Sequence, residues 1–140
     1  VAEMRGRYRD EDEREAFASA RLTAEEAVLD SIRRSSVVGA VLDSTGRTIA
    51  LFGVGSPTLV GGVGVPWMMG SRDVDRHSRA AITEGRRIMG ILRSHFALLH
   101  NYVDARNTKA IRWLKAVGFH VMPAVPYGPF AALFHPFEMR

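Results

Sequence analysis

Nineteen consecutive residues encode a strand, a capped helix and a helix stop: Asn101-Tyr-Val-Asp-Ala-Arg-Asn-Thr-Lys-Ala-Ile-Arg-Trp-Leu-Lys-Ala-Val-Gly-Phe119. Asn107 is a residue type that caps helices, because its side chain can accept hydrogen bonds from free N–H groups of the first turn. Apolar residues then recur at helical spacing, at Ala110, Ile111, Leu114 and Val117. Gly118 stands where a helix commonly ends in a left-handed conformation, and Phe119 leads into a further strand. These signals predict a buried strand, a turn, an amphipathic helix and a returning strand.

The length and composition fit one compact domain. The chain has 140 residues, of which 46% are hydrophobic, so it can bury roughly two-thirds of its unfolded surface. We therefore expect a single domain over residues 1 to 140, with residues 1 to 10 as a loose N-terminal arm. The absence of cysteine excludes a disulfide framework and a thiolate zinc site. The longest apolar run, residues 63 to 69, is too short to span a bilayer, and the charged residues 1 to 12 do not resemble a signal peptide.

Helix and strand signals alternate along the rest of the chain. Thr23 and Glu26 form a capping-box pattern before an apolar helix, and residues 43 to 46 form a hairpin turn. Ser71 can cap a long helix that follows a glycine-containing strand. The pattern predicts helices at residues 12 to 20, 24 to 34, 72 to 93 and 108 to 117, and strands at 37 to 42, 48 to 54, 59 to 65, 97 to 103, 120 to 125 and 131 to 137. Residues 66 to 70 continue or end the third strand.

Four residues, Asn107, Ala110, Gly118 and Phe119, match in register the last conserved motif of the GNAT-type N-acetyltransferases, N-x-x-A-x-x-x-Y-x-x-x-G-F. The chain therefore resembles this family, and the expected order of its elements is similar to the family's order. The resemblance implies an α/β (α+β) fold with a mixed, mostly antiparallel sheet, a splayed central pair of parallel strands and about four flanking helices. In that fold the pantetheine arm of the coenzyme lies in the gap between the splayed strands.

The resemblance also implies where acetyl-coenzyme A would bind if the chain is an enzyme. Its pyrophosphate lies on backbone N–H groups at the start of the long central helix, where the helix dipole favours an anion. The matching cofactor-binding residues are Met69, Gly70, Ser71 and Arg72, with Asn107 orienting the amide arm; residues 79 to 85 are the alternative position. The family's phosphate loop, R/Q-x-x-G-x-G/A, has its nearest counterpart at Arg79, but Ile82 and Glu84 replace its small residues. A branched side chain and a negative charge both oppose a pyrophosphate, so this loop is remodelled or lost.

The catalytic acid of the family motif is missing from this sequence. Leu114 occupies the position of the tyrosine that in many GNAT enzymes protonates the leaving thiolate, and the indole of Trp113 cannot replace it. Three glutamates on the expected N-terminal helices could act as a base, although capping and solvation also explain them: Glu13, Glu25 and Glu26. The five histidines lack metal-ligand spacing, so no metal site is expected. The catalytic residues thus stay open.

A narrower resemblance rests on segments between about residues 20 and 139, most specifically on Pro66-Trp67 and Trp113-Leu114. These segments are similar to a small family of GNAT-like internal virion or core proteins of short-tailed bacteriophages. The resemblance implies a virion-associated or assembly protein with a catalytically degenerate fold, which needs no cofactor. Such a protein would act in the virion or the host cytoplasm, through contacts with other virion proteins or through self-association. We take this as the first hypothesis for the function.

Two other hypotheses stay open. In one, the chain is an active acetyl-coenzyme A-dependent N-acetyltransferase of unknown acceptor, which works largely by positioning the amine and the thioester. In the other, it binds nucleic acid, because residues 72 to 115 hold ten Arg or Lys residues against four acids. Aromatic side chains for stacking on single strands are sparse in that segment, so nucleic acid is the least favoured partner.

Overall fold

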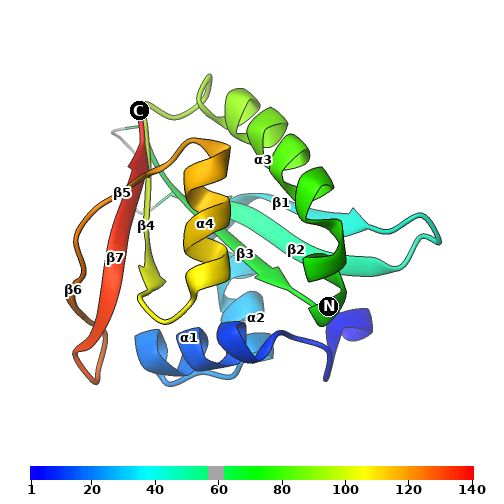
Figure 1. Cartoon of the computed structure of the whole chain (residues 1–140), viewed down its shortest axis with the longest axis horizontal. Helices are drawn as coiled ribbons and strands as arrows, with labels where there is room; N and C mark the ends of the chain where they lie inside the picture. The colour runs from blue at the N-terminus through cyan, green and yellow to red at the C-terminus, as the bar shows by residue number, and fades with distance from the viewer. Residues whose placement is uncertain (57–61) are drawn as a thin grey trace.

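The computed structural model describes residues 1 to 56 and 62 to 140, and these residues form a mixed sheet flanked by helices (Figure 1). The helices are α1 (Asp10–Ala20), α2 (Ala24–Arg34), α3 (Ser78–Leu92) and α4 (Thr108–Val117), with the 3-10 helices η1 (Ala2–Met4) and η2 (Arg72–His77). The strands are β1 (Ser35–Leu42), β2 (Thr48–Gly55), β3 (Val63–Gly70), β4 (Leu98–Asp104), β5 (His120–Val121), β6 (Val125–Tyr127) and β7 (Ala132–Met139). The order in the sheet is β1-β2-β3-β4-β7-β5, and β6 also pairs with β7. The expected fold class is confirmed.

Capping interactions define the ends of α2 and α4. Thr23 Oγ1 accepts a hydrogen bond from the Glu26 N–H at 3.2 Å, and Glu26 Oε1 accepts one from the Thr23 N–H at 3.0 Å. Asn107 Oδ1 accepts a hydrogen bond from the Ala110 N–H at 3.3 Å, which satisfies a free donor in the first turn of α4. Gly118 ends that helix with a φ of 117°, a conformation that side chains other than glycine rarely adopt. The capping box, the Asn107 cap and the glycine stop are all confirmed.

The central parallel strands separate after a short paired segment. Among the described residues, β3 and β4 pair only at Val63↔Leu98 and Gly64↔Leu99, whereas the neighbouring strand pairs are antiparallel and longer. Beyond these two positions the strands diverge, as Figure 1 shows. The Asn101 side chain bridges the start of the gap, because its Nδ2 donates a hydrogen bond to the Pro66 carbonyl at 2.8 Å. This is the splayed parallel pair that the resemblance implies.

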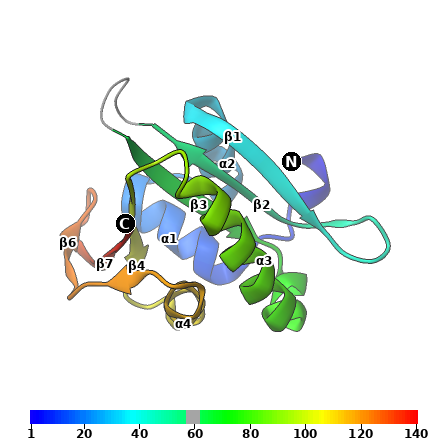
Figure 2. The same cartoon turned by 90° about the horizontal axis from the view of Figure 1, so that it is seen from above.

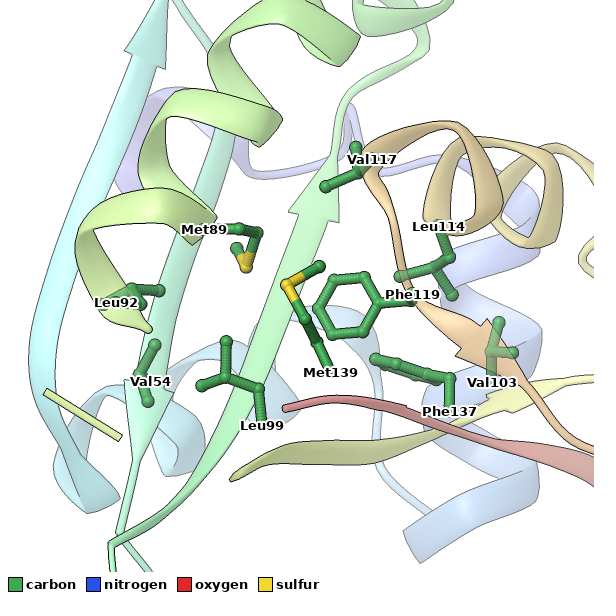
Figure 3. Packing of buried hydrophobic residues seen from close by; sticks show 10 residues of the cluster. All are labelled: Val54, Met89, Leu92, Leu99, Val103, Leu114, Val117, Phe119, Phe137 and Met139. Atoms are coloured by element: carbon green, nitrogen blue, oxygen red, sulfur yellow. The ribbon is translucent and has the colours of Figure 1, made fainter. Parts of the chain in front are cut away.

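Apolar side chains form separate clusters on the two faces of the sheet. On one face, α3 and α4 lie next to each other (Figure 2) and cover Leu99 of β4, Met139 of β7 and Phe119, which follows α4. Figure 3 shows this cluster, in which the rings of Phe119 and Phe137 meet edge to face with centroids 5.1 Å apart. On the other face, α2 packs with the N-terminal segment over β2. Both layers of helices therefore reach the central strands.

The third strand and the long helix differ from the expected boundaries. Part of the expected strand, residues 59 to 61, lies outside the described residues, and β3 runs from Val63 through the Pro66-Trp67 segment to Gly70. The helix expected at 72 to 93 is divided, because residues 72 to 77 form η2 and the α-helix begins only at Ser78. Ser71 does cap a helix, since its Oγ accepts a hydrogen bond from the Asp73 N–H at 3.3 Å. It caps the 3-10 turn rather than α3.

Both ends of the chain differ from what the sequence predicts. Residues 1 to 10, expected as a loose arm, pack on the sheet through Met4 and Tyr8, which are 0% and 3% exposed. The Arg9 N–H also donates to the Gly70 carbonyl at 3.1 Å, which fixes this segment beside the end of β3. At the other end, the strand expected at 120 to 125 is divided into β5 and β6, which pair with different parts of β7.

The contact between α3 and α4 is tight at one glycine, and this gives a test of the fold. A methyl group on Gly85 would lie 2.8 Å from Trp113 Cζ2 and 2.9 Å from Val117 Cγ2. We expect Gly85→Ala to lower the free energy of unfolding by about 1–3 kcal/mol, the usual cost of overpacking. Gly90→Ala on the same helix is the matched control, because a methyl group there meets no atom within 4 Å. It should raise stability by up to about 1 kcal/mol through helix propensity. Urea unfolding of both variants measures this, and equal effects would contradict the close packing.

Candidate functional site

A cavity of about 530 Å³ lies where β3 and β4 separate. Its walls include Pro66 and Met68 of β3 and Asn101 and Val103 of β4, which follow the last paired positions of the two strands. All four α-helices also contribute residues, so the cavity connects the helix layer on one face of the sheet with the layer on the other. An opening through the sheet therefore joins two chemically different halves.

The half beside α3 and α4 is mostly apolar. Its walls come from the following residues: His77, Ala80, Ala81, Glu84, Gly85, Ile88, Asn107, Ala110, Trp113 and Leu114. The Trp113 Nε1–H is buried and has no hydrogen-bond partner among the described residues. Asn107 is also buried, and its Oδ1 is already used as the cap of α4. This half thus offers small and apolar side chains together with an unpaired N–H donor.

The half beside α1 and α2 carries carboxyl groups and aromatic rings. The carboxyls belong to Asp12, Glu15 and Asp30, and the aromatic side chains that line the cavity with them include Trp67, Tyr102 and Tyr127. Two arginines partly balance these charges: Arg9 lines the cavity and pairs with Glu11, and Arg34 lies 3.2 Å from Asp30 Oδ2. The rings of Tyr102 and Tyr127 stack with centroids 4.1 Å apart. Acidic groups beside aromatic faces form a surface that is suited to a cation.

Two of these carboxyl groups are held in place by backbone N–H groups of the diverging strands. Glu15 Oε1 accepts a hydrogen bond from the Asp104 N–H at 2.6 Å, and Asp12 Oδ2 accepts one from the Gly70 N–H at 2.9 Å. Burial raises the pKa of Glu15 to about 8, and the charges of Asp12 and Asp104 add to this rise against the hydrogen bond from Asp104. Burial likewise raises the pKa of Asp12 to about 6, although the nearby Arg9 and the Gly70 hydrogen bond oppose it. Such shifted carboxyls in a cavity are typical of functional groups.

Asp104, next to Glu15, has the opposite electrostatic environment. Burial favours its neutral form, but hydrogen bonds from the Arg106 side chain and backbone outweigh this effect and lower the pKa of Asp104. Arg106 Nη2 lies 2.7 Å from Asp104 Oδ2. Asp104 is therefore a paired structural carboxylate, whereas no described residue forms an ion pair with Glu15.

The cofactor-binding residues expected from the sequence are only partly brought together. Met69 and Asn107 line the cavity, whereas Gly70, Ser71 and Arg72 do not. The backbone N–H groups of these last three residues are used within the protein, with Asp12 Oδ2, the Ile49 carbonyl and the Arg7 carbonyl as acceptors. The cavity instead touches the start of α3, where His77 makes no capping hydrogen bond.

The expected catalytic positions divide in the same way. Leu114 lines the cavity and is buried, with 6% of its surface exposed. An aliphatic side chain therefore stands at the position of the tyrosine in the family motif. Glu13 and Glu26 accept backbone hydrogen bonds from Ala24 and Thr23, and Glu25 pairs with Arg5. The sequence interpretation missed Asp12 and Glu15. One signal was available, because positions 12, 15, 16 and 19 fall on one face of a helix and all four line the cavity.

Within residues 1 to 56 and 62 to 140, no group of three or more His, Asp or Glu side chains is placed to hold a metal ion. No helix in these ranges combines the length and the apolar character that a bilayer crossing requires.

No protein-family model and no curated protein sequence matches the chain. The structure nevertheless resembles solved GNAT-family structures, and the chain has the GNAT fold. A GCN5-related N-acetyltransferase from Kribbella flavida is 20% identical over 84% of this chain and 77% of that chain, with a TM-score of 0.61. Spermidine N-acetyltransferase from Vibrio cholerae, solved in complex with CoA and spermine, is 15% identical over 82% and 72%, with a TM-score of 0.62. A GNAT-family acetyltransferase from Streptococcus pneumoniae is 12% identical over 84% and 76%, with a TM-score of 0.60.

The raised pKa of Glu15 predicts a pH dependence of stability. The folded chain keeps this proton up to a pH of about 8, whereas the unfolded chain releases it near the ordinary value of about 4.3. At a pH between these two pKa values, unfolding releases a proton. Rising pH must therefore lower the free energy of unfolding, by up to about 1.4 kcal/mol per pH unit. Asp12 adds to this slope only below a pH of about 6.

Urea unfolding of the wild type and of Glu15→Gln between pH 5 and 8 checks this prediction. The variant should lose most of the slope above pH 6 and should be the more stable protein at pH 8. Asp10→Asn is the control, because it removes an exposed carboxyl of the same helix outside the cavity and should keep the wild-type slope. A Glu15→Gln variant that retains the full slope contradicts the assignment.

Proposed function

We propose that the chain binds acetyl-coenzyme A in the cavity between β3 and β4 and transfers its acetyl group to an amine. The observation that carries this proposal is the cavity itself, which passes between the splayed strands and has an apolar half and an acidic half. The fold supports the proposal, and one structure with this fold, the Vibrio cholerae spermidine N-acetyltransferase, was solved with CoA and spermine.

The residues beside α3 and α4 fit the coenzyme's pantetheine arm. That arm is narrow and mostly apolar and carries amide groups, and the unpaired Trp113 Nε1–H is a donor for one amide carbonyl. Asn107 lines the same half, and its Oδ1 holds α4 in position. The coenzyme supplies an activated acetyl thioester. The chain's own part is to hold the amine and the thioester in one orientation and to keep bulk water away from the apolar half.

The coenzyme's phosphates fit best at the start of α3. Small side chains, Ala80 and Ala81, line the cavity there, and α3 begins without a side-chain cap. The positive end of its dipole favours an anion at this position. Arg76 and Arg79 flank this turn and are exposed. Leu114 leaves α4 without a phenol, so this helix would supply no acid to the coenzyme's thiol group.

A calorimetric titration with acetyl-coenzyme A tests this proposal. We expect a dissociation constant in the micromolar range, and Arg76→Ala and Arg79→Ala should each weaken binding by about tenfold, or about 1.4 kcal/mol. Arg72→Ala tests the position expected from the sequence. If this substitution alone weakens coenzyme binding, the phosphates bind at the end of β3 instead. Arg33→Ala, an exposed arginine on α2, is the charge-matched control and should bind as the wild type does. An absence of heat and of thermal stabilisation at millimolar coenzyme would contradict the proposal.

A second candidate function is favoured by a surface feature. Phe17 of α1 and Phe130 are 56% and 49% exposed and stack with ring centroids 5.1 Å apart, and Leu133, three residues after Phe130 in the chain, is 56% exposed. Apolar side chains gathered on a surface are typical of protein interaction sites. Together with the resemblance to phage core proteins, they support a role for the chain as a virion-associated or assembly protein in the virion or the host cytoplasm.

This second candidate predicts association through the aromatic surface. Light scattering should show an oligomer, or a pull-down should recover other virion proteins, and Phe17→Ser with Phe130→Ser should abolish either result. The Leu29→Ser variant, which changes an exposed apolar residue on α2, should not. A wild-type chain that remains monomeric and captures no virion protein rules out this role.

A further inference from the structure

The two edges of the sheet are built differently. One edge is formed by β5 and β6, which have two and three residues, and β6 contains Pro126. Short strands and proline are features that keep an exposed edge from pairing with another chain. The other edge is β1, a strand of eight residues, Ser35-Ser-Val-Val-Gly-Ala-Val-Leu42, without charge or proline. This second edge therefore lacks the protection that the first one has.

No described strand pairs with the outer side of β1. It is the end strand of the sheet (Figure 2), and its pairing with β2 is regular from Val37 to Val41, with irregularities at its two ends. An edge strand presents a row of backbone N–H and C=O groups that point away from the sheet. The regular middle of β1 therefore offers this row in the geometry that a further strand requires.

Apolar side chains are exposed on both faces of β1. Successive side chains of a strand point to opposite faces of the sheet, and the neighbours Val37 and Val38 are 46% and 44% exposed. Leu42, at the end of the strand, is 55% exposed. Neither layer of helices therefore fully covers this strand. A docked strand would bury apolar surface on both faces in addition to pairing its backbone.

The N-terminal end of β1 carries a net positive charge. Arg33 and Arg34, both exposed, are the last residues of α2 and directly precede the strand. Arg34 lies 3.2 Å from Asp30 Oδ2, so this acid balances one of the two arginines. The side chain of Arg34 is nevertheless 77% exposed, and it remains accessible to a partner.

The C-terminal end of β1 carries a carboxylate. Asp43 follows the last residue of the strand, and its hydrogen bonds from Thr45 and Arg47 fall on Oδ1 within the described part of the chain. The guanidinium of Arg47 lies 3.9 Å from Asp73 Oδ2, on another element. In an antiparallel pair of two β1 strands, the arginines of each copy lie near the partner's Asp43, and the uncharged middle brings no like charges together. The strand is therefore complementary to itself.

We propose that β1 is a self-association edge, at which a second copy of this chain adds its own β1 in antiparallel orientation. The result is a two-fold symmetric dimer with one sheet that continues across both copies. Its axis passes near Val38, in the middle of the strand, because this register brings ends of opposite charge together. In such a dimer the same surface serves both copies, and the association closes at two. The inference depends neither on acetyl transfer nor on the aromatic surface at Phe17 and Phe130.

Sedimentation velocity of the full chain over a range of concentrations tests this proposal. We expect the wild type to form a dimer and Val38→Lys to raise its dissociation constant at least about tenfold. Lysine is a residue that protects natural edge strands, and the two-fold axis places the two ammonium groups close together. Val125→Lys is the matched control, because it makes the same change at a valine of β6 that is 39% exposed. It should dimerise as the wild type does.

Oxidative cross-linking tests the register of the two strands. The chain has no cysteine, so a single introduced cysteine reports its own surroundings. Facing residues of antiparallel strands have Cβ atoms about 4.5–5.5 Å apart, so Val38→Cys should form a disulfide-linked dimer. Leu42→Cys should not, although Leu42 is the more exposed residue. Antiparallel pairing around Val38 places the two copies of Leu42 roughly 25 Å apart.

Three results would overturn the proposal. The first is a wild type that stays monomeric at every concentration, which leaves β1 to another partner or to none. The second is a dimer that Val38→Lys leaves intact while Phe17→Ser with Phe130→Ser abolishes it, because association then takes place through the aromatic surface. The third is cross-linking as efficient at Leu42 as at Val38. This comparison decides the question even if Val38→Lys is unstable, since neither cysteine variant adds a charge to the strand.

Discussion

The early separation of β3 and β4 is the constraint on which the rest of the structure depends. Among the described residues, the ladder between the two halves of the sheet has two paired positions, Val63↔Leu98 and Gly64↔Leu99. Past them, each strand must find other partners for its buried polar groups. Asn101 satisfies the Pro66 carbonyl, and Asp12 satisfies the Gly70 N–H, so side chains replace the missing ladder. The gap is thus stabilised by specific hydrogen bonds rather than left unsatisfied.

The side chains that replace strand pairing in the gap also bring charge into the cavity. Asp12 and Glu15 both lie on α1. Their carboxyl groups accept hydrogen bonds from backbone N–H groups of β3 and β4, on the two sides of the gap. A single helix therefore holds both edges of the opening and supplies the acidic groups of its wall. The structural role and the chemical role of these carboxyls come from one arrangement, in which one oxygen binds the backbone and the rest of the group borders the cavity.

Local signals in the sequence predicted most of the fold and less of the site. The Thr23 and Asn107 caps and the Gly118 stop depend on residues close in sequence, and each is confirmed. The predicted start of α3 at residue 72 was wrong because Ser71 caps a 3-10 turn, and no short-range pattern distinguishes that turn from an α-helix. Glu15 was missed because the acidic run at residues 10 to 15 contains five acids, and the contact with β4 selects which of them faces the cavity. Such long-range contacts are not encoded in helical spacing alone.

The two unusual carboxyls also bear on the loss of the family's tyrosine. Asp12 and Glu15 have raised pKa values, so their charged forms lower the stability of the folded chain at neutral pH. Residues that reduce stability in this way persist more readily where a ligand uses them. Leu114, by contrast, packs in the core and contributes to stability. The α4 wall is therefore organised for packing and the α1 wall for charge, so the chemistry of this cavity is to be sought at Glu15 rather than at position 114.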